Sequence, residues 1–386
     1  MRIVQVASYF PPPYGGIESH VYYLSKELVR LGHEVTILTS RSPGQSSIKE
    51  EARDGILVKR LWTPLSLFSF PFMPVLLCRI LREEADIFHG HINSPMIVEP
   101  AAAGSWLRQI PLVITYHADI IPEDLGLGSI ALARLISWLY EGLFKRIDVR
   151  VARRIVATTQ TYAESSEFLA GYLDKVTVIP NGVDLDRFRP SLDTSEVRGR
   201  LGSEDEKILF FAGRLVPYKG LDYLLEAFSA LCAARSDLRL ILLGIGPLMD
   251  DLQRQAQMMR LGDRVRFMGS VSEEDLPRFY AASDIVVVPS RSRSEGFSIS
   301  ALQGMASGKP IVATRVGGVP FLVEDGRTGI LVEPKDPGQL SAAISRILED
   351  TTLAARMGRA GRLRAERLFN WRRIAKMTEK LYEEIL

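Results

Sequence analysis

The sequence predicts an α/β protein with two doubly wound domains. Short apolar runs, of the kind buried in parallel sheets, alternate with amphipathic helical patterns along most of the chain. The chain of 386 residues is longer than a single hydrophobic core usually supports, so we expect two domains. Glycine- and proline-rich turns follow several of the apolar runs, and such turns are typical of the ligand-binding edge of these sheets.

The overall composition is that of an ordinary globular protein and excludes several classes. A total of 48 Lys and Arg against 46 Asp and Glu leaves a net charge of +2, so the overall charge does not indicate a nucleic-acid partner. Cys78 and Cys232 lie far apart, which favours a reducing compartment over a disulfide framework. The first residues form a strand pattern rather than a signal peptide, and no apolar run reaches the roughly 18 residues that span a bilayer. We therefore expect a cytoplasmic protein, and we leave a peripheral contact with the membrane face open.

The first elements predict a β-loop-α-β unit. Ile3–Ala7 is an apolar run that leads into a proline-stiffened loop with Gly15 and Gly16, and the following helical pattern closes at Gly32 before a strand at Glu34–Thr39. Glycines at the first turn bring backbone N–H groups to a ligand in many α/β folds. The same glycines also serve a plain tight turn, so both interpretations stay open.

Two later segments combine apolar and basic residues. Residues 64–82 contain three prolines before a helix, and residues 127–154 form a long apolar helical pattern. The cations that accompany them are Arg79, Arg82, Lys145, Arg146, Arg150, Arg153 and Arg154. Buried helices beside a solvated basic face explain this pattern, and so does a surface that meets anionic lipid.

Two strands between these segments end in polar residues. The pattern predicts strands at Ile87–His89 and Leu112–Tyr116, and the second is followed by His117. A histidine just past a parallel strand lies at the usual ligand-binding edge. Lone histidines are as often structural, so position alone does not assign His117.

The middle of the chain reads as a domain boundary. A strand at Val176–Ile179 runs into a Pro-Asn-Gly turn, and residues 191–206 are charged without apolar periodicity, which predicts a linker. Asp184 and Asp186 spell a D-x-D pair, but no further acidic cluster accompanies them, so we expect no metal there. We place the boundary after Asp186, with domains at 1–186 and 187–370, and assign the last helix, 371–386, to the first domain.

The second half restarts the alternation of strands and helices. The predicted strands are Ile208–Ala212, Leu238–Leu243 and Val265–Met268. The predicted helices are Leu221–Ala234, Leu248–Arg260, Glu273–Ala282, Gln339–Leu348, Thr352–Leu368 and Trp371–Ile385. This order predicts a second doubly wound domain.

A loop with two cations follows the first strand of that domain. The segment GRLVPYKG carries Arg214 and Lys219, which can neutralise a diphosphate, Arg by a two-pronged contact and Lys as a point charge. Solvated surface charge is the simpler interpretation. The next strand ends in Gly244 and Gly246, which would let backbone approach a nucleotide. Neither the dinucleotide fingerprint nor a Walker loop is present, which argues against an ATPase or a kinase.

The stretch 287–316 holds the strongest candidate site. A strand at Ile285–Pro289, a Ser- and Arg-rich loop and a helix at Ser298–Ser307 bring Glu295 to a helix N-terminus, where free N–H groups favour negative charge. Gln303 lies eight residues further along the same helix. One carboxylate, one amide and several N–H donors can bind a polyhydroxylated group that ends in phosphate.

Several motifs together resemble a known family. They are GGIESH (15–20), TYHAD (115–119), IPNGVD (179–184), GRLVPYKG (213–220), LLGIGP (242–247) and the long segment 287–314. They resemble the retaining nucleotide-sugar glycosyltransferases of family 4, also called glycosyl transferases group 1. The resemblance implies the GT-B fold, in which two Rossmann-like domains face each other across a cleft and the last helix crosses back to the first domain.

The resemblance also implies residue roles. Arg214 and Lys219 would hold the donor diphosphate as it leaves, Glu295 would bind donor-sugar hydroxyls, and His117 would lie over the reacting centre. The other donor-binding residues that the resemblance implies are Gly16, Asn181, Gly244, Met268, Gly296, Phe297, Ser298 and Gln303. The family signature has a second glutamate where this chain has Gln303, and an amide keeps an acceptor for the nucleotide ribose but loses the charge.

The implied reaction moves a hexose from a UDP- or GDP-linked sugar to an acceptor hydroxyl, with retention of configuration and without a metal or another cofactor. The acceptor expected is a lipid-linked or glycan hydroxyl, of the phosphoinositide type or a polyprenyl-diphosphate-linked sugar, at an anionic membrane surface. A nucleotide-sugar epimerase or hydrolase of similar fold and an inactive binding subunit remain as alternatives.

Overall fold

The computed structural model describes residues 1–11, 15–41, 49–67, 70–92, 96–117, 119, 145–202 and 205–386. The chain forms two compact units. Unit 1 comprises Met1–Gly182 together with Trp371–Leu386, and unit 2 comprises Val183–Asn370. The boundary expected after Asp186 therefore lies slightly beyond the observed one.

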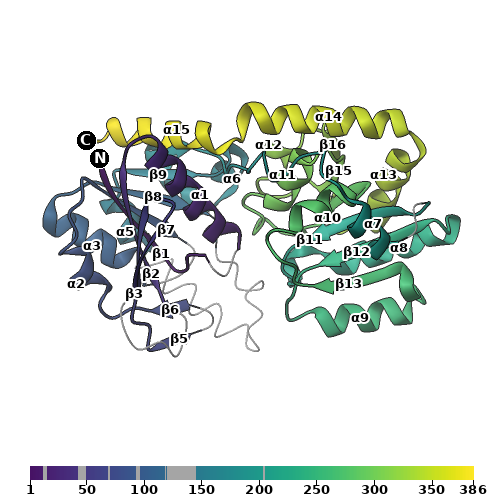
Figure 1. Ribbon diagram of the computed structural model, residues 1–386, viewed down its shortest axis with the longest axis horizontal. Helices are drawn as coiled ribbons and strands as arrows, with labels where there is room; N and C mark the ends of the chain where they lie inside the picture. The colour runs from purple at the N-terminus through teal and green to yellow at the C-terminus, as the bar shows by residue number, and fades with distance from the viewer. Residues whose placement is uncertain are drawn as a thin grey trace. The chain divides into compact units, whose positions relative to one another are not determined.

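Unit 1 is built on an eight-stranded sheet with strand order β10-β9-β8-β7-β1-β2-β4-β3, in which only the β3–β4 pair is antiparallel (Figure 1). Its strands are β1 (Arg2–Ala7), β2 (Glu34–Ser40), β3 (Lys49–Arg53), β4 (Ile56–Leu61), β7 (Ile87–Ile92), β8 (Leu112–Tyr116), β9 (Arg154–Ala157) and β10 (Val176–Val178). A separate hairpin pairs β5 (Leu65–Leu67) with β6 (Phe70–Phe72). The described helices are α1 (Gly16–Arg30), α2 (Leu76–Ile80), α3 (Glu99–Arg108), α5 (Lys145–Val151), α6 (Gln160–Ser165), η3 (Leu169–Lys175) and α15 (Trp371–Glu383).

Helices cover both faces of this sheet. On one face, α1 packs beside α15, whose side chains Trp371, Ile374 and Tyr382 enter the same core as Val21 and Leu24 (Figure 1). On the other face, α2, α3, α5 and α6 bury their apolar sides in a second core. The amphipathic last helix thus completes the hydrophobic core of unit 1.

Unit 2 has a six-stranded parallel sheet in the order β13-β12-β11-β14-β15-β16. Its strands are β11 (Lys207–Ala212), β12 (Leu238–Leu243), β13 (Val265–Gly269), β14 (Ile285–Val288), β15 (Ile311–Thr314) and β16 (Gly329–Val332). Its helices are α7 (Ser195–Leu201), η4 (Pro217–Lys219), α8 (Leu221–Ala234), α9 (Met249–Met258), η5 (Gly262–Arg264), α10 (Leu276–Ala282), α11 (Ile299–Ala306), α12 (Val319–Leu322), α13 (Pro337–Glu349) and α14 (Thr351–Leu368). Along β11, Ile208 and Phe210 enter one core while Leu209 and Phe211 enter the other. This alternation is expected because successive side chains of a strand point to opposite faces of the sheet, and both faces of this sheet are buried.

The parallel strands of each sheet reverse their order once. The reversal falls between β1 and β7 in unit 1 and between β11 and β14 in unit 2. Open α/β sheets bind ligands in the crevice at such a switch point, outside the carboxyl ends of the strands. The prediction of two doubly wound α/β domains is confirmed, and the two switch points are where a site is expected.

Several sequence predictions need correction. Residues 191–206 are not a plain linker, because α7 lies within them and buries Val197 and Leu201 in a core of unit 2. The strand expected at Ile87–His89 runs on to Ile92. The pattern also missed β3, β4, β9 and β16.

Lys145 was wrongly counted with the solvated cations. It is fully buried, its ammonium lies over the rings of Tyr116 and Phe168, and it approaches the carboxylate of Asp119. Arg146 and Arg150 are exposed. Most of the apolar helix expected before Lys145 lies outside the described residues. None of the described helices is long and apolar enough to cross a membrane.

Candidate functional site

The switch point of unit 2 carries a buried ion pair. Lys219, at the end of the loop after β11, donates a hydrogen bond of 2.7 Å to Oε2 of Glu295, in the loop after β14. Ser290 Oγ donates to the same oxygen at 2.6 Å. The side chains of Lys219 and Glu295 are only 13% and 5% exposed. Two groups that the sequence suggested separately are therefore held together, 76 residues apart along the chain.

The surroundings keep Lys219 charged. Burial lowers its pKa, but Glu295 and Tyr218 outweigh burial and raise the pKa well above the ordinary value. Arg214, in the same loop, is exposed, and its guanidinium makes no hydrogen bond or ion pair with a described residue. One fixed cation and one available cation thus lie in a single loop at the switch point.

Close backbone contacts fix the loops around this pair. Gly220 has a φ of +66°, and a Cβ there would clash with the carbonyl oxygen of Pro289. Gly244 has a φ of +142°, and a Cβ there would clash with the carbonyl oxygen of Gly213. Only glycine fits at both positions, so the loops after β11, β12 and β14 pack with backbone against backbone. Gly244 therefore has a structural reason to be glycine beside the donor-binding role expected for it.

Glu295 precedes the helix α11. The carbonyl oxygen of Glu295 accepts from the N–H of Gly318 at 2.9 Å, and Ser298 caps α11 by accepting from the N–H of Ala301 at 3.3 Å. Gly296 lies between them, and the buried ring of Phe297 packs edge-on against Phe369. The predicted arrangement of a carboxylate at the start of a helix is present.

Two expected donor-binding residues lie on flanking elements. Gln303 is half-buried on α11, and its side chain makes no hydrogen bond with a described residue. Met268 lies in β13 and packs partly against a core of unit 2. The amide group of Gln303 is free to accept a ligand hydroxyl.

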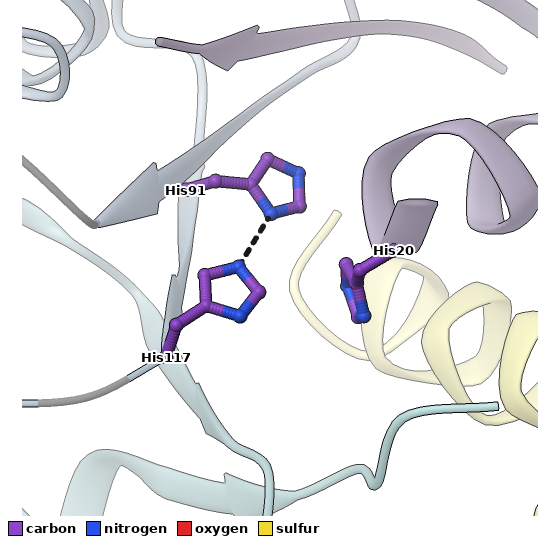
Figure 2. A group of neighbouring side chains, drawn as sticks. All are labelled: His20, His91 and His117. Atoms are coloured by element: carbon purple, nitrogen blue, oxygen red, sulfur yellow. Dashed lines mark hydrogen bonds between the residues drawn. The ribbon is translucent and has the colours of Figure 1, made fainter. Parts of the chain in front are cut away.

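The switch point of unit 1 carries a cluster of buried histidines. His89 and His91 lie on β7, His117 follows β8, and His20 projects from α1. Figure 2 shows the rings of His91 and His117 side by side, with His20 across from them. Four of the five histidines of the chain therefore gather at one edge of the sheet.

Amide side chains orient this cluster. His91 Nε2 lies 3.0 Å from Gln5 Oε1, and His91 Nδ1 lies 3.3 Å from His117 Nε2 (Figure 2). Because the Gln5 oxygen can only accept, His91 carries its proton on Nε2 and accepts at Nδ1 from the N–H of His117. This assignment leaves Nδ1 of His117 as an acceptor.

The other two rings are also held by hydrogen bonds, His20 by an amide and His89 by two hydroxyl groups. His20 Nδ1 donates to Oδ1 of Asn181 at 2.5 Å, and its Nε2 is buried without a partner among the described residues. His89 is bonded to Tyr382 of the last helix at 2.6 Å and to Thr115 at 2.7 Å. Asn181, expected to bind the donor, is thus engaged with His20. Gly16, the other donor-binding residue expected in this half, is the exposed first residue of α1.

Burial keeps the histidines neutral. It lowers the pKa of His20 to about 4 and that of His89 to about 3, and it lowers the pKa of both His91 and His117 well below the ordinary value. Possible ligand atoms of His20, His91 and His117 lie within 4.8 Å of one another. Neutral imidazoles suit zinc and similar ions, so this group is where a transition metal would bind. The expectation that the protein uses no metal stays a prediction.

Sequence reasoning missed Gln5, His20, His89 and His91. The signal available was the pair of histidines on one strand, His89 and His91, whose side chains point to the same face of the sheet because they are two residues apart.

The two doubly wound domains have the fold of the GT-B glycosyltransferase class, and the family matches assign the chain to that class. Residues 193–364 match the family Glycosyl transferases group 1, and residues 14–187 match Glycosyltransferase Family 4. The chain belongs to this glycosyltransferase family.

Named relatives agree along nearly the whole chain. A D-inositol 3-phosphate glycosyltransferase of Nocardioides sp. is 33% identical and covers 95% of this chain and 85% of its own length. A GDP-mannose-dependent alpha-(1-6)-phosphatidylinositol monomannoside mannosyltransferase of Mycolicibacterium smegmatis is 32% identical and covers 97% of each chain. The structure of sucrose-phosphate synthase from Thermosynechococcus elongatus matches with a TM-score of 0.77 at 25% identity, covering 100% of this chain and 98% of that one.

Proposed function

We propose that this glycosyltransferase moves a hexose from a nucleoside-diphosphate sugar to a hydroxyl of a lipid-linked acceptor, with retention of configuration and without a metal. The observation that carries the proposal is the buried pair of Lys219 and Glu295 at the switch point of unit 2, with the exposed guanidinium of Arg214 in the same loop. This arrangement supplies positive charge for a diphosphate and a carboxylate for sugar hydroxyls at one switch point.

The chemistry assigned to these residues is electrostatic. As the bond between the sugar and the diphosphate breaks, negative charge grows on the departing oxygen, and Lys219 and Arg214 stabilise that charge. The acceptor hydroxyl attacks from the same face of the sugar and gives its proton to a diphosphate oxygen. Glu295, fixed by Lys219 and Ser290, accepts from the sugar hydroxyls. The roles of Gly16, His117 and Asn181 toward the donor stay predictions.

One relative supports the choice of donor and acceptor, since it is named as dependent on GDP-mannose and as acting on a phosphatidylinositol monomannoside. Another is named for D-inositol 3-phosphate, which carries no lipid, and supports an inositol-containing acceptor only. In unit 1, Trp106 and Ile147 are 66% and 50% exposed, and Arg146 and Arg150 are exposed on the same helix as Ile147. Aromatic, aliphatic and cationic groups together suit an anionic membrane face, so we propose peripheral binding there.

The test of the transferase assignment is the variant Arg214→Ala. Because Arg214 is exposed and unpaired among described residues, its removal should lower the transfer rate by about 10²–10³ without lowering the melting temperature. Arg254→Ala, which removes an exposed cation from α9 of the same unit, is the matched control and should change neither. An unchanged rate in Arg214→Ala would place the diphosphate elsewhere, and donor consumption that needs no acceptor would indicate an epimerase or hydrolase.

Donor and metal are tested on the same protein. Screening UDP- and GDP-linked sugars for thermal stabilisation identifies the base, since a bound ligand raises the melting temperature through linkage. Transfer should survive a chelator. A loss of activity that zinc restores would overturn metal independence and would point to His20, His91 and His117.

Membrane binding is tested by flotation with anionic vesicles. The double variant Arg146→Ala with Arg150→Ala should float less than the unchanged chain, because each cation near an anionic surface contributes about 1 kcal/mol. Arg356→Ala with Arg359→Ala removes the same charge from exposed positions of α14 and is the control. Equal flotation of the two double variants would contradict the assignment.

A further inference from the structure

A cavity of about 480 Å³ lies beside the helices α3 and α5 of unit 1. Its size is within the range of roughly 300–1,000 Å³ that small-molecule sites occupy. None of the residues assigned above to glycosyl transfer lines it. Its walls include Glu99, Ala102, Trp106, Ile147, Asp148 and Val151.

Two acidic side chains face this mostly apolar space. Asp148 is fully buried, and neither of its carboxylate oxygens has a hydrogen-bond partner among the described residues. Glu99 accepts from backbone N–H groups at the start of its own helix, while its Oε2 is buried without a partner in the described part of the chain. Burial, and after it the charge of Glu99, raises the pKa of Asp148 to about 9. Buried carboxyls without partners are unfavourable, so the cavity is poised for a group that would satisfy them.

The pattern of acceptors selects the ligand chemistry. Three buried oxygens lack a partner among the described residues. The charge of an ammonium group bound beside Asp148 would lower the raised pKa of that carboxyl, so Asp148 would release its proton as the ligand binds. The three oxygens could then accept the three N–H groups of a primary ammonium. A quaternary ammonium has no N–H and would leave all three oxygens unpaired. A hard metal ion would need about six oxygen ligands, which the alanine, valine and isoleucine side chains cannot supply.

We propose that this cavity binds a primary ammonium group carried on an apolar body, with the nitrogen between Glu99 and Asp148 and the apolar part against Trp106 and Ile147. The exposed indole of Trp106 supplies an aromatic face for the apolar body. The site goes beyond the proposed transferase, since it uses none of the residues assigned to the donor. It shares Trp106 and Ile147 with the face proposed to bind the membrane.

Calorimetric titration of the full chain with phenethylamine near neutral pH tests the proposal. We expect saturable binding with one site per chain. Two analogues serve as controls: 2-phenylethanol keeps the shape without the charge, and the N,N,N-trimethyl derivative keeps the charge without N–H donors. Both should bind at least about tenfold more weakly, since charge-assisted hydrogen bonds are lost. Equal binding of all three compounds would overturn the proposal. The absence of saturable amine binding would also overturn it, because the cavity would then hold only solvent.

Variants locate the site. Asp148→Asn and Glu99→Gln should each weaken amine binding by about tenfold or more. Asp174→Asn, which removes an exposed carboxylate elsewhere in unit 1, should leave it unchanged. Amine binding that is the same in Asp148→Asn as in the unchanged chain would overturn the assignment to this cavity. Transfer activity is not the readout, so failure here is distinguishable from failure of the proposed function.

The amine has two possible sources, a lipid headgroup or a free small molecule. Flotation with vesicles of equal negative charge that contain either phosphatidylethanolamine or phosphatidylcholine separates them, because methylation removes the N–H donors. A preference for phosphatidylethanolamine that Asp148→Asn abolishes supports the lipid source. Phenethylamine binding without a lipid preference supports a free amine, and both results support the ammonium site.

Discussion

At the residue scale, the pair of Lys219 and Glu295 leads to a prediction that distinguishes a loss of stability from a loss of transfer activity. Glu295→Gln leaves the buried ammonium of Lys219 without its counter-charge, so we expect the free energy of unfolding to fall by about 3–5 kcal/mol. The double variant Glu295→Gln with Lys219→Met removes both charges and should recover much of that loss while transfer stays lost. Denaturant unfolding and transfer assays measure the two effects. A double variant no more stable than Glu295→Gln would contradict an energetic coupling between the two side chains.

The histidine cluster makes a second prediction at this scale. The pKa values of His20 and His89 are lowered in the fold to about 4 and about 3, so the unfolded chain binds more protons below its own histidine pKa of about 6.5. Above a pH of about 6.5 the rings are neutral in both states, so they do not lower the free energy of unfolding. As the pH falls from there toward the pKa values of the folded state, the unfolded chain takes up protons first and the free energy of unfolding decreases. We expect the free energy of unfolding to drop steeply between about pH 6.5 and 4, as measured by denaturant unfolding. His20→Gln should make that slope shallower, and an unchanged slope would show that His20 is not buried in neutral form.

Single residues also show what the sequence can and cannot predict. Arg214, Lys219 and Glu295 were identified because loops at the carboxyl ends of strands are recognisable from the strand pattern. The contact of Gln5 with His91 depends on the register of β1 against β7, which no local pattern reveals. The burial of Lys145 depends on rings from β8 and from residue 168, so a local basic pattern gave the wrong result.

At the element scale, helix α5 makes a prediction about pH. Because the folded pKa of Asp148 is about 9 against an ordinary 3.8, the fold favours the protonated acid, and this group lowers the stability progressively as the pH rises between those values. Asp148→Asn should therefore raise the free energy of unfolding near pH 7, by an amount on the order of 2–4 kcal/mol, and the gain should grow up to about pH 9. Thermal unfolding over this pH range measures it, with Asp174→Asn as the control. A loss of stability in Asp148→Asn would show that the carboxyl has a native partner.

Elements differed in how well the sequence predicted them. The central strands β1, β2, β11 and β12 are near-continuous apolar runs, because parallel strands are covered on both faces, and they were found close to their true bounds. The strands β3 and β4 are rich in charged residues, so no apolar run marked them. Helix α7 has only Val197 and Leu201 as buried anchors, too few for a helical period to stand out.

At the scale of the whole molecule, the alternation of strands and helices along the chain predicts two doubly wound units, but it does not show which elements belong to each unit. The parallel strands of both sheets reverse their order once, as doubly wound folds do, and the switch points bring together loops that are far apart in sequence. The last helix belongs to the first unit, which was expected only from the family resemblance. The amphipathic period of α15 shows that the helix buries one face. It does not show which of the two sheets that face packs against.

The membership of α15 in unit 1 gives the last prediction. Ile374→Ala removes a side chain that is 1% exposed in the core shared with α1, so the unfolding free energy of unit 1 should fall by about 2–5 kcal/mol. Leu363→Ala on α14 is the matched control, because Leu363 is 65% exposed and its loss should change stability by no more than about 0.5 kcal/mol. In calorimetry, a nucleoside diphosphate identifies the transition of unit 2 by raising it, and Ile374→Ala should lower the other transition. If Ile374→Ala lowered the nucleotide-sensitive transition instead, α15 would stabilise unit 2, and the division of the chain described above would be wrong.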